Sequence, residues 1–217
     1  MCFSASASFV ASAVLTGIGI YALHKQKGTS QWPLAIIPFI FAIQQAIEGF
    51  LWLSLTKWEN TGAVVLSSIF LFFAFFFWPS YMPWVAAKLE TNPARKKLHT
   101  QIWYIGLTFG SALYLFFLLK PVSAYVNGNS ICYSYYPYLG TDFNTLPWLV
   151  VPYVGFTVLT GIVSKNRVFK LFSVLAGTLM LIAWYFHHET FTSTWCFFAA
   201  VLSLILLIPA PKLAHRH

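Results

Sequence analysis

The sequence predicts an all-α integral membrane protein, a seven-helix bundle that forms a single domain over residues 1–217. First, 59% of the residues are hydrophobic and only 8% are charged, whereas about 25% of the residues of a typical soluble domain are charged. Second, the hydrophobic residues form long runs separated by short polar segments, a pattern typical of multi-pass membrane proteins. Third, the basic residues concentrate in alternate loops, which predicts the orientation of the bundle.

Seven apolar runs have lengths near the about 20 residues that a helix needs to cross a bilayer. Helices are expected because backbone polar groups must find their partners within the segment in lipid. The runs also lack the alternating pattern of a membrane barrel. The predicted spans are residues 3–24, 33–56, 62–88, 102–120, 146–164, 168–186 and 190–208.

The loops at one end of the predicted bundle contain only two basic residues, Lys57 and Lys120. The opposite loops contain the others: Lys25, Lys27, Lys88, Arg95, Lys96, Lys97, Lys165, Arg167, Lys170, Lys212 and Arg216. Because cytoplasmic loops are rich in Lys and Arg, we expect the N-terminus outside and the C-terminus in the cytoplasm. The net charge of +8 then reflects membrane topology, and no nucleic-acid partner is expected.

The first span opens with "MCFSASASF", which lies at its outer end. Ser4, Ser8 and Ser12 recur every four residues, with Ala7 and Ala11 beside them. Small residues at this spacing let a second helix approach closely, so this face is interpreted as a packing surface.

Cys2 follows the initiator methionine directly. Removal of Met1 would leave a thiol beside an α-amine with a pKa near about 8. Such a pair can chelate a metal or act as nucleophile and base, which makes Cys2 a candidate catalytic residue.

The second span contains the acidic residue that lies deepest in the predicted membrane, Glu48, in "FAIQQAIEGFLWLS". Gln44 and Gln45 precede it by one turn and Trp52 follows by one turn, so all four lie near one face. At about 1.5 Å per residue, Glu48 lies roughly 12 Å below the outer end of the helix. Two interpretations remain open: a hydrogen-bonded glutamate that locks helices together, or a polar pocket in which Glu48 is proton carrier, base or ligand.

The outer loop between the fourth and fifth spans, residues 121–145, is rich in tyrosine and contains Asp142. Loops of this length often act as lids over a site, and an interfacial loop is the alternative interpretation. The stretch "NGNS" at Asn127 to Ser130 predicts a hairpin turn.

The last span is preceded by a short outer turn with His187, His188 and Glu189. It then contains Trp195 and Cys196, and Cys196 lies at a depth close to that of Glu48. The adjacent histidines are interpreted either as surface residues or as ligands.

All three cysteines, Cys2, Cys132 and Cys196, fall on the outer side of the predicted topology. Three interpretations stay open: a disulfide, which an oxidising compartment permits, a zinc or other transition-metal site, and unreactive thiols.

The stretches "MCFSASASF", "QQAIEGFLWLSL" and "TSTWCFFAAVLS" together resemble an uncharacterised family of small bacterial multi-pass membrane proteins that begin Met-Cys-Phe-Ser-Ala. The resemblance implies a location in the bacterial inner (cytoplasmic) membrane and implies no activity. It places Cys2, Glu48, Trp195 and Cys196 within the motifs of the family. A looser analogy is with seven-helix, zinc-dependent lipid amidases of the alkaline ceramidase type, although the last span lacks their histidine pair.

These residues lead to a hypothesis of function, a polar pocket that opens to the outer face. In its enzyme form the protein is a metal-dependent hydrolase in which zinc or another transition metal activates water against a lipid-like or apolar substrate. The expected residues are Glu48 and Cys2 in catalysis, Gln44, Gln45, Trp52 and Trp195 in the pocket, and Cys2, Glu48, His188 and Cys196 on the metal.

Two alternatives stay open beside the enzyme. One is a small-molecule binding or transport protein with Glu48 as its proton or cation site. The other is a purely structural membrane protein. Membrane lipids are expected partners in every case.

Overall fold

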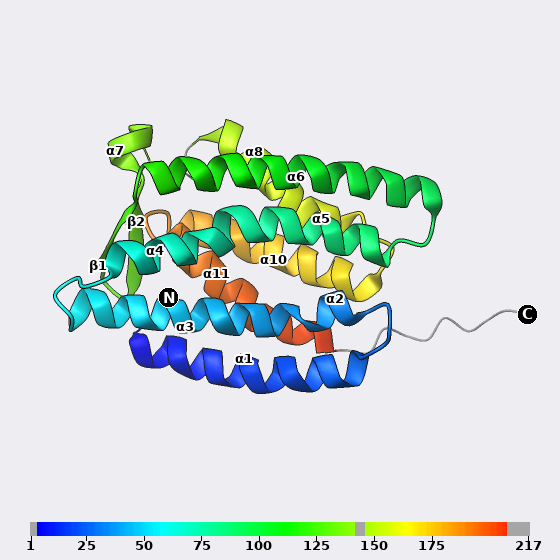
Figure 1. Ribbon diagram of the computed structural model, residues 1–217, viewed down its shortest axis with the longest axis horizontal. Coiled ribbons are helices and arrows are strands. Elements are labelled where there is room, and N and C mark those ends of the chain that lie inside the picture. Colours follow the sequence, from blue (N-terminus) through cyan, green and yellow to red (C-terminus); the bar gives the residue numbers. More distant parts are fainter. Residues whose placement is uncertain (1–3, 142–145, 208–217) are drawn as a thin grey trace, which may run out of the picture.

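The computed structural model describes residues 4–141 and 146–207. Most of these residues are helical, and the long helices run roughly along one axis as an elongated bundle (Figure 1). The α-helices are α1 (Ala5–Gln26), α2 (Trp32–Ala35), α3 (Ile37–Thr56), α4 (Ala63–Leu71), α5 (Trp78–Leu89), α6 (Pro93–Leu119), α7 (Tyr136–Leu139), α8 (Pro147–Val154), α9 (Thr160–Ile162), α10 (Arg167–Phe186) and α11 (Phe191–Leu202).

Three helical segments are not α-helical. The first π segment, Phe72–Phe77, joins α4 to α5, and the second π segment, Gly155–Leu159, joins α8 to α9. A short 3-10 helix, Ser203–Leu207, follows α11. The π segments therefore interrupt two otherwise continuous helices, Ala63–Leu89 and Pro147–Ile162.

Within the described residues, five helices are long and apolar enough to cross a membrane, and two further apolar helices are shorter. These seven helices fall on the seven predicted spans. The five long ones are Ala5–Gln26, Trp32–Thr56, Ala63–Leu89, Pro93–Leu119 and Arg167–Phe186, and the shorter ones are Pro147–Ile162 and Phe191–Leu206.

The fourth of these helices, α6, begins at Pro93 and not at residue 102, where its apolar run begins. Its N-cap is Asn92, whose side chain accepts a hydrogen bond from the backbone N–H of Arg95 at 3.1 Å. The capped first turns are polar, so a search for apolar residues alone misses them.

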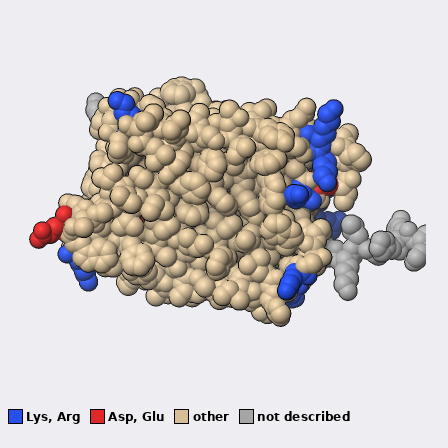
Figure 2. All heavy atoms as spheres, in the orientation of Figure 1, with Lys and Arg blue, Asp and Glu red and all other residues tan. Residues whose placement is uncertain are grey.

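On the face shown in Figure 2, charged side chains lie at the two ends of the bundle. In the view of Figure 2, Lys and Arg side chains occupy both ends, and the broad belt between them is formed by other residue types. Such a belt suits a surface in contact with lipid, because charged groups are costly there.

α1 and α3 pack closely through two glycines. A Cβ atom on Gly19 would lie 2.6 Å from the Cβ of Phe39, and one on Gly49 would lie 2.8 Å from the ring of Phe9. Ser12 also donates its hydroxyl to the backbone carbonyl of Ala42 at 2.8 Å. The predicted small-residue face of the first span is therefore the face that packs on α3.

The loop that follows α6 forms a hairpin of β1 (Ser123–Asn127) and β2 (Ser130–Ser134), with Asn127 paired to Ser130. Gly128, at φ 58°, follows Asn127 and supplies the positive φ that a two-residue turn requires. The predicted hairpin turn is confirmed.

The hairpin is held against the turn between α10 and α11. Asn127 donates to the Glu189 carboxylate at 2.5 Å, and the Cys132 thiol donates to the Glu189 backbone carbonyl at 3.0 Å. Beyond β2, the Tyr135 and Thr192 hydroxyls lie 3.1 Å apart. The hairpin thus closes one end of the bundle.

The opposite end contains an ion pair between Glu90 and Arg95, with 2.8 Å between Oε2 and Nε. The other Glu90 oxygen accepts from the backbone N–H groups of Thr91 and Asn92. The Arg95 hydrogen bond, followed by the smaller contributions of these backbone groups, holds the pKa of Glu90 below its usual value.

Arg95 also reaches across to another helix. Its Nη2 donates to the backbone carbonyl of Val163, just beyond α9, at 2.6 Å. The ion pair therefore fastens the loop between α5 and α6 to the end of the second interrupted helix.

Candidate functional site

A fully buried carboxyl group lies between α3 and α11. Glu48 projects from α3 with no exposed surface, and the Ser193 hydroxyl of α11 donates to its Oε1 at 2.6 Å. Gln45, one turn earlier on α3, donates to Oε2 at 3.3 Å. Buried carboxyl groups are retained where neighbouring groups hydrogen-bond to them, and here two helices supply those groups.

Gln44 extends this polar cluster to a third helix. Its Oε1 accepts a hydrogen bond from the indole N–H of Trp78 at the start of α5, at 2.9 Å. Within the described residues, the amide nitrogen of Gln44 and the amide oxygen of Gln45 have no hydrogen-bond partner, although both side chains are completely buried. A buried donor and a buried acceptor of this kind can bind a water molecule or a small ligand.

Cys196 lies beside the same cluster. Its thiol, on α11, is close to the Gln44 side chain and within electrostatic range of Glu48. The predicted proximity of Glu48 and Cys196 is therefore present in the structure. We refer to Gln44, Gln45, Glu48, Ser193 and Cys196 together as the polar cluster.

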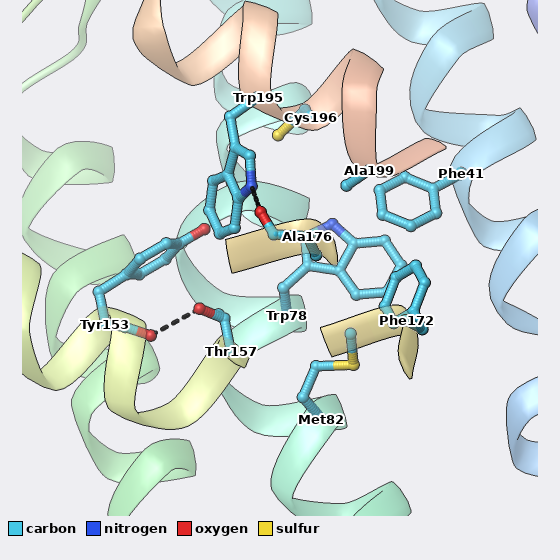
Figure 3. Close-up of a pocket in the computed structure, with 10 residues that line it drawn as sticks. All are labelled: Phe41, Trp78, Met82, Tyr153, Thr157, Phe172, Ala176, Trp195, Cys196 and Ala199. Atoms are coloured by element: carbon cyan, nitrogen blue, oxygen red, sulfur yellow. Dashed lines mark hydrogen bonds between the residues drawn. The ribbon is translucent and has the colours of Figure 1, made fainter. Parts of the chain in front are cut away.

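A small cavity of about 30 Å³ adjoins the polar cluster at Cys196 (Figure 3). This volume is enough for about one or two water molecules. Aromatic side chains dominate its wall, and Figure 3 shows them converging on the cavity from different helices. The cavity is lined by Phe41, Trp78, Met82, Tyr153, Thr157, Phe172, Ala176, Trp195, Cys196 and Ala199.

The second π segment borders this cavity, and the first ends directly before Trp78, which lines it. In the first, the N–H of Trp78 bonds to the carbonyl of Phe73, five residues earlier. The next residue, Pro79, has no N–H to give to the carbonyl of Ala74. The Tyr153 hydroxyl donates to that carbonyl instead, at 2.8 Å, so a side chain from one interrupted helix completes the backbone of the other.

The second π segment contributes Thr157 to the cavity wall. Its hydroxyl donates to the backbone carbonyl of Tyr153 at 2.7 Å (Figure 3). The indole N–H of Trp195 donates to the carbonyl of Ala176 at 3.2 Å, which fixes its ring against the cavity. Because π segments inside α-helices are frequent at functional sites, their meeting here marks the cavity and the polar cluster as the candidate site.

The predicted site residues lie in different places. Gln44, Gln45, Glu48 and Cys196 belong to the polar cluster, and Trp195 lines the cavity. All of these side chains are buried, so none of them gives the pocket an opening on the outer face.

The other predicted residues lie elsewhere. Trp52 is buried in a hydrophobic cluster that also contains Tyr133 of β2. His188 is half-buried in the turn between α10 and α11, where it lines a surface groove with Asn129 and Glu189. In the same turn, burial lowers the pKa of His187. Cys2 lies outside the described residues.

The described residues contain no group of three or more His, Cys, Asp and Glu side chains that could hold a metal ion. Cys132 and Cys196 are also not bonded to each other. Cys132 instead lies under the hairpin, at the turn between α10 and α11. Any metal site built on Glu48 and Cys196 therefore needs a further ligand from outside these residues.

Several residues of the site were not predicted from the sequence. Ser193, Trp78, Tyr153 and Thr157 lie in apolar runs, where a single hydroxyl or indole is common. One signal was present: Ser193 lies in "TFTSTW", a run of hydroxyl residues at the outer end of the last span. Polar groups at the depth of an intramembrane acid are its natural partners.

The fold and this site define a class, that of mostly helical proteins with several helices apolar enough to cross a membrane and a polar cluster buried between them. The chain belongs to the family of unknown function DUF6629, whose model matches residues 1–216. The predicted membership of an uncharacterised family is confirmed. No curated protein and no solved structure matches the chain.

Proposed function

We propose that the protein is a seven-span protein of the bacterial inner membrane that binds or transports a small cation or a proton at Glu48. The seven apolar helices support the span count. The basic residues at the C-terminal ends of α1 and α5 and at the start of α6 support an outer N-terminus and a cytoplasmic C-terminus.

The observation that carries this proposal is the complete burial of Glu48 beside two glutamine side chains, each of which has one amide atom without a hydrogen-bond partner in the described residues. A carboxylate is unstable in a medium of low dielectric constant unless a proton or a positive charge neutralises it. A mobile proton or a small cation bound at Glu48 would supply this positive charge.

The size of the cavity favours a small ligand over a lipid-like substrate. A volume of about 30 Å³ accommodates a water molecule or an ion of similar size, whereas small-molecule sites typically have about 300–1,000 Å³. A proton reaches such a site through a short chain of water molecules, without a wide opening.

The metal-dependent hydrolase receives less support from the described residues. Glu48 and Cys196 supply two side chains of ligand type at one place, and zinc sites in enzymes use three protein ligands. The hydrolase therefore depends on a contribution from Cys2, and it is tested in the same experiment.

The test is thermal unfolding of the purified protein in detergent, over a pH series and in sodium, potassium, ammonium and choline chloride at equal ionic strength. We expect pH or one of these cations to shift the unfolding temperature of the unmodified protein. Binding at 100 times Kd stabilises a protein by about 2.7 kcal/mol. Glu48→Gln should abolish the shift, and the matched control Glu59→Gln, at an exposed position, should retain it.

Two outcomes overturn the proposal. If the stability of Glu48→Leu equals that of the unmodified protein and no condition shifts either, Glu48 has a structural role. If native mass spectrometry shows one transition-metal ion per chain that is lost in Cys196→Ser, the hydrolase replaces the cation site.

A further inference from the structure

A second site lies on the side of the bundle, away from the polar cluster. α6, α7 and α8 enclose an apolar groove with a volume of about 490 Å³, within the about 300–1,000 Å³ range of small-molecule sites. Its lining comes from Phe109, Ala112, Leu113, Phe116, Tyr138, Leu139, Leu146, Trp148 and Leu149.

A positive charge lies next to Tyr138, one of the residues that line the groove. Lys120 follows the last residue of α6, and its Nζ lies 5.9 Å from the centre of the Tyr138 ring. The Tyr138 hydroxyl donates to the carbonyl of Pro121 at 3.1 Å, which fixes this ring beside Lys120. The cation therefore lies beside a residue of the groove lining.

The lining of the groove on α6 runs from Phe109 to Phe116, a rise of about 10 Å at about 1.5 Å per residue. Lys120 follows one turn later, so the groove and its neighbouring cation together span about 16 Å. Half of the hydrocarbon core of a bilayer is about 15 Å thick. Tyr138 lies near Lys120, as suits an aromatic side chain at the headgroup level.

We propose that this groove is a specific phospholipid site, in which an acyl chain lies along α6 and the headgroup phosphate pairs with Lys120. The apolar lining matches the chain, Lys120 matches the phosphate, and the span from Lys120 to the far end of the groove matches one leaflet. This site is independent of the cation or proton site proposed at Glu48.

The test is native mass spectrometry of the delipidated protein in detergent, with dioleoyl phosphatidylglycerol and dioleoylglycerol as probes. The two lipids share their acyl chains, and only the first has a phosphate. We expect one tightly bound phosphatidylglycerol per chain and weaker binding of dioleoylglycerol. Lys120→Gln should weaken binding of phosphatidylglycerol about fivefold and leave binding of dioleoylglycerol unchanged.

A second pair of variants tests the groove itself. Ala112→Trp fills the groove from an exposed position of α6 and should remove binding of both lipids, whereas Ser111→Trp, also exposed on α6 but outside the lining, should bind as the unmodified protein does. Circular dichroism confirms that each variant is folded. The proposal is overturned if Ala112→Trp binds normally, if both lipids bind equally well, or if Lys57→Gln weakens binding as much as Lys120→Gln.

Discussion

The presence of Glu48 within a membrane helix costs free energy. An ionisable residue at the centre of a membrane helix costs about 2.5–3.5 kcal/mol by insertion scales. In this protein Ser193 and Gln45 offset part of that cost by donating to both carboxyl oxygens. The position of Glu48 is thus fixed by its neighbours, as expected of a group that must be presented at one place between helices.

Removal of the Ser193 hydroxyl should test how much the buried Glu48 depends on this hydrogen bond. Ser193→Ala withdraws a donor from the buried carboxyl, and we expect the free energy of unfolding to fall by about 1–2 kcal/mol. Ser68→Ala is the matched control, because the Ser68 hydroxyl is exposed and donates within its own helix. Thermal unfolding in detergent compares the two. Equal stability of both variants would show that Ser193 is dispensable to the cluster.

The sequence predicts part of this site because helical periodicity is local. Gln44, Gln45 and Glu48 share a face by spacing alone, and Cys196 shares their depth. The contacts of Glu48 with Ser193 and of Gln44 with Trp78 join residues far apart in the chain. Such contacts depend on the rotation of each helix about its axis, which is set by packing among all the helices and is not encoded in any one segment.

At the scale of elements, α1 is held to α3 by the absence of side chains at Gly19 and Gly49. The close neighbours of Gly19 are backbone and Cβ atoms of Phe39, which cannot rotate away. A Cβ atom on Gly17, which belongs to the same helix, would have no neighbouring atom within 4 Å, so Gly17 faces open space. A comparison of alanine substitutions at Gly17 and Gly19 in α1 therefore distinguishes the effect of helix propensity on stability from the effect of packing.

Gly19→Ala should destabilise the protein by about 1–3 kcal/mol through overpacking. Gly17→Ala should leave stability unchanged or raise it by up to about 1 kcal/mol, because alanine favours helix. Thermal unfolding of both variants provides the comparison. A neutral Gly19→Ala would mean that α1 moves away from α3 at little cost.

The Glu90–Arg95 pair gives the loop before α6 a dependence on pH. Its stabilising contribution is complete above the unfolded-state pKa of about 4.3. Since the folded-state pKa is lower, this contribution is lost as pH falls from that value through the folded pKa. Glu90→Gln should lower the free energy of unfolding by about 1–3 kcal/mol at pH 7.

The difference in the free energy of unfolding between the unmodified protein and Glu90→Gln should shrink as pH falls below about 4.3. Thermal unfolding of the unmodified protein and of Glu90→Gln at pH 7, 5 and 3 measures it. A difference that stays constant over this range would assign the effect to packing and not to charge.

Hydropathy predicts which segments form helices better than it predicts where those helices begin and end. Apolar runs locate the helices because burial in lipid or protein needs apolar surface. The start of α6 depends on a cap at Asn92, and the first π segment depends on a proline and on a tyrosine from another helix. The hairpin turn is visible as "NGNS", while the position of its strands depends on contacts with Glu189.

At the scale of the whole molecule, the charge asymmetry predicts which end faces the cytoplasm. Lys57 and Lys97 are both exposed and lie on opposite predicted sides of the membrane. In spheroplasts, a membrane-impermeant maleimide should label Lys57→Cys directly and Lys97→Cys only after permeabilisation. The unmodified protein measures labelling of the native cysteines. The reverse pattern would invert the topology and place the hairpin in the cytoplasm.

The pairing of Glu48 with Ser193 also constrains the order of biosynthesis. Glu48 enters the membrane early, whereas its partner lies 145 residues later in the chain. The hairpin likewise waits for Glu189, which lies 62 residues beyond Asn127. A nascent chain that has not yet released α11 from the ribosome therefore contains an acid without its hydroxyl donor and a hairpin without its support. The polar cluster and the support of the hairpin are therefore completed only after the last helix has been synthesised.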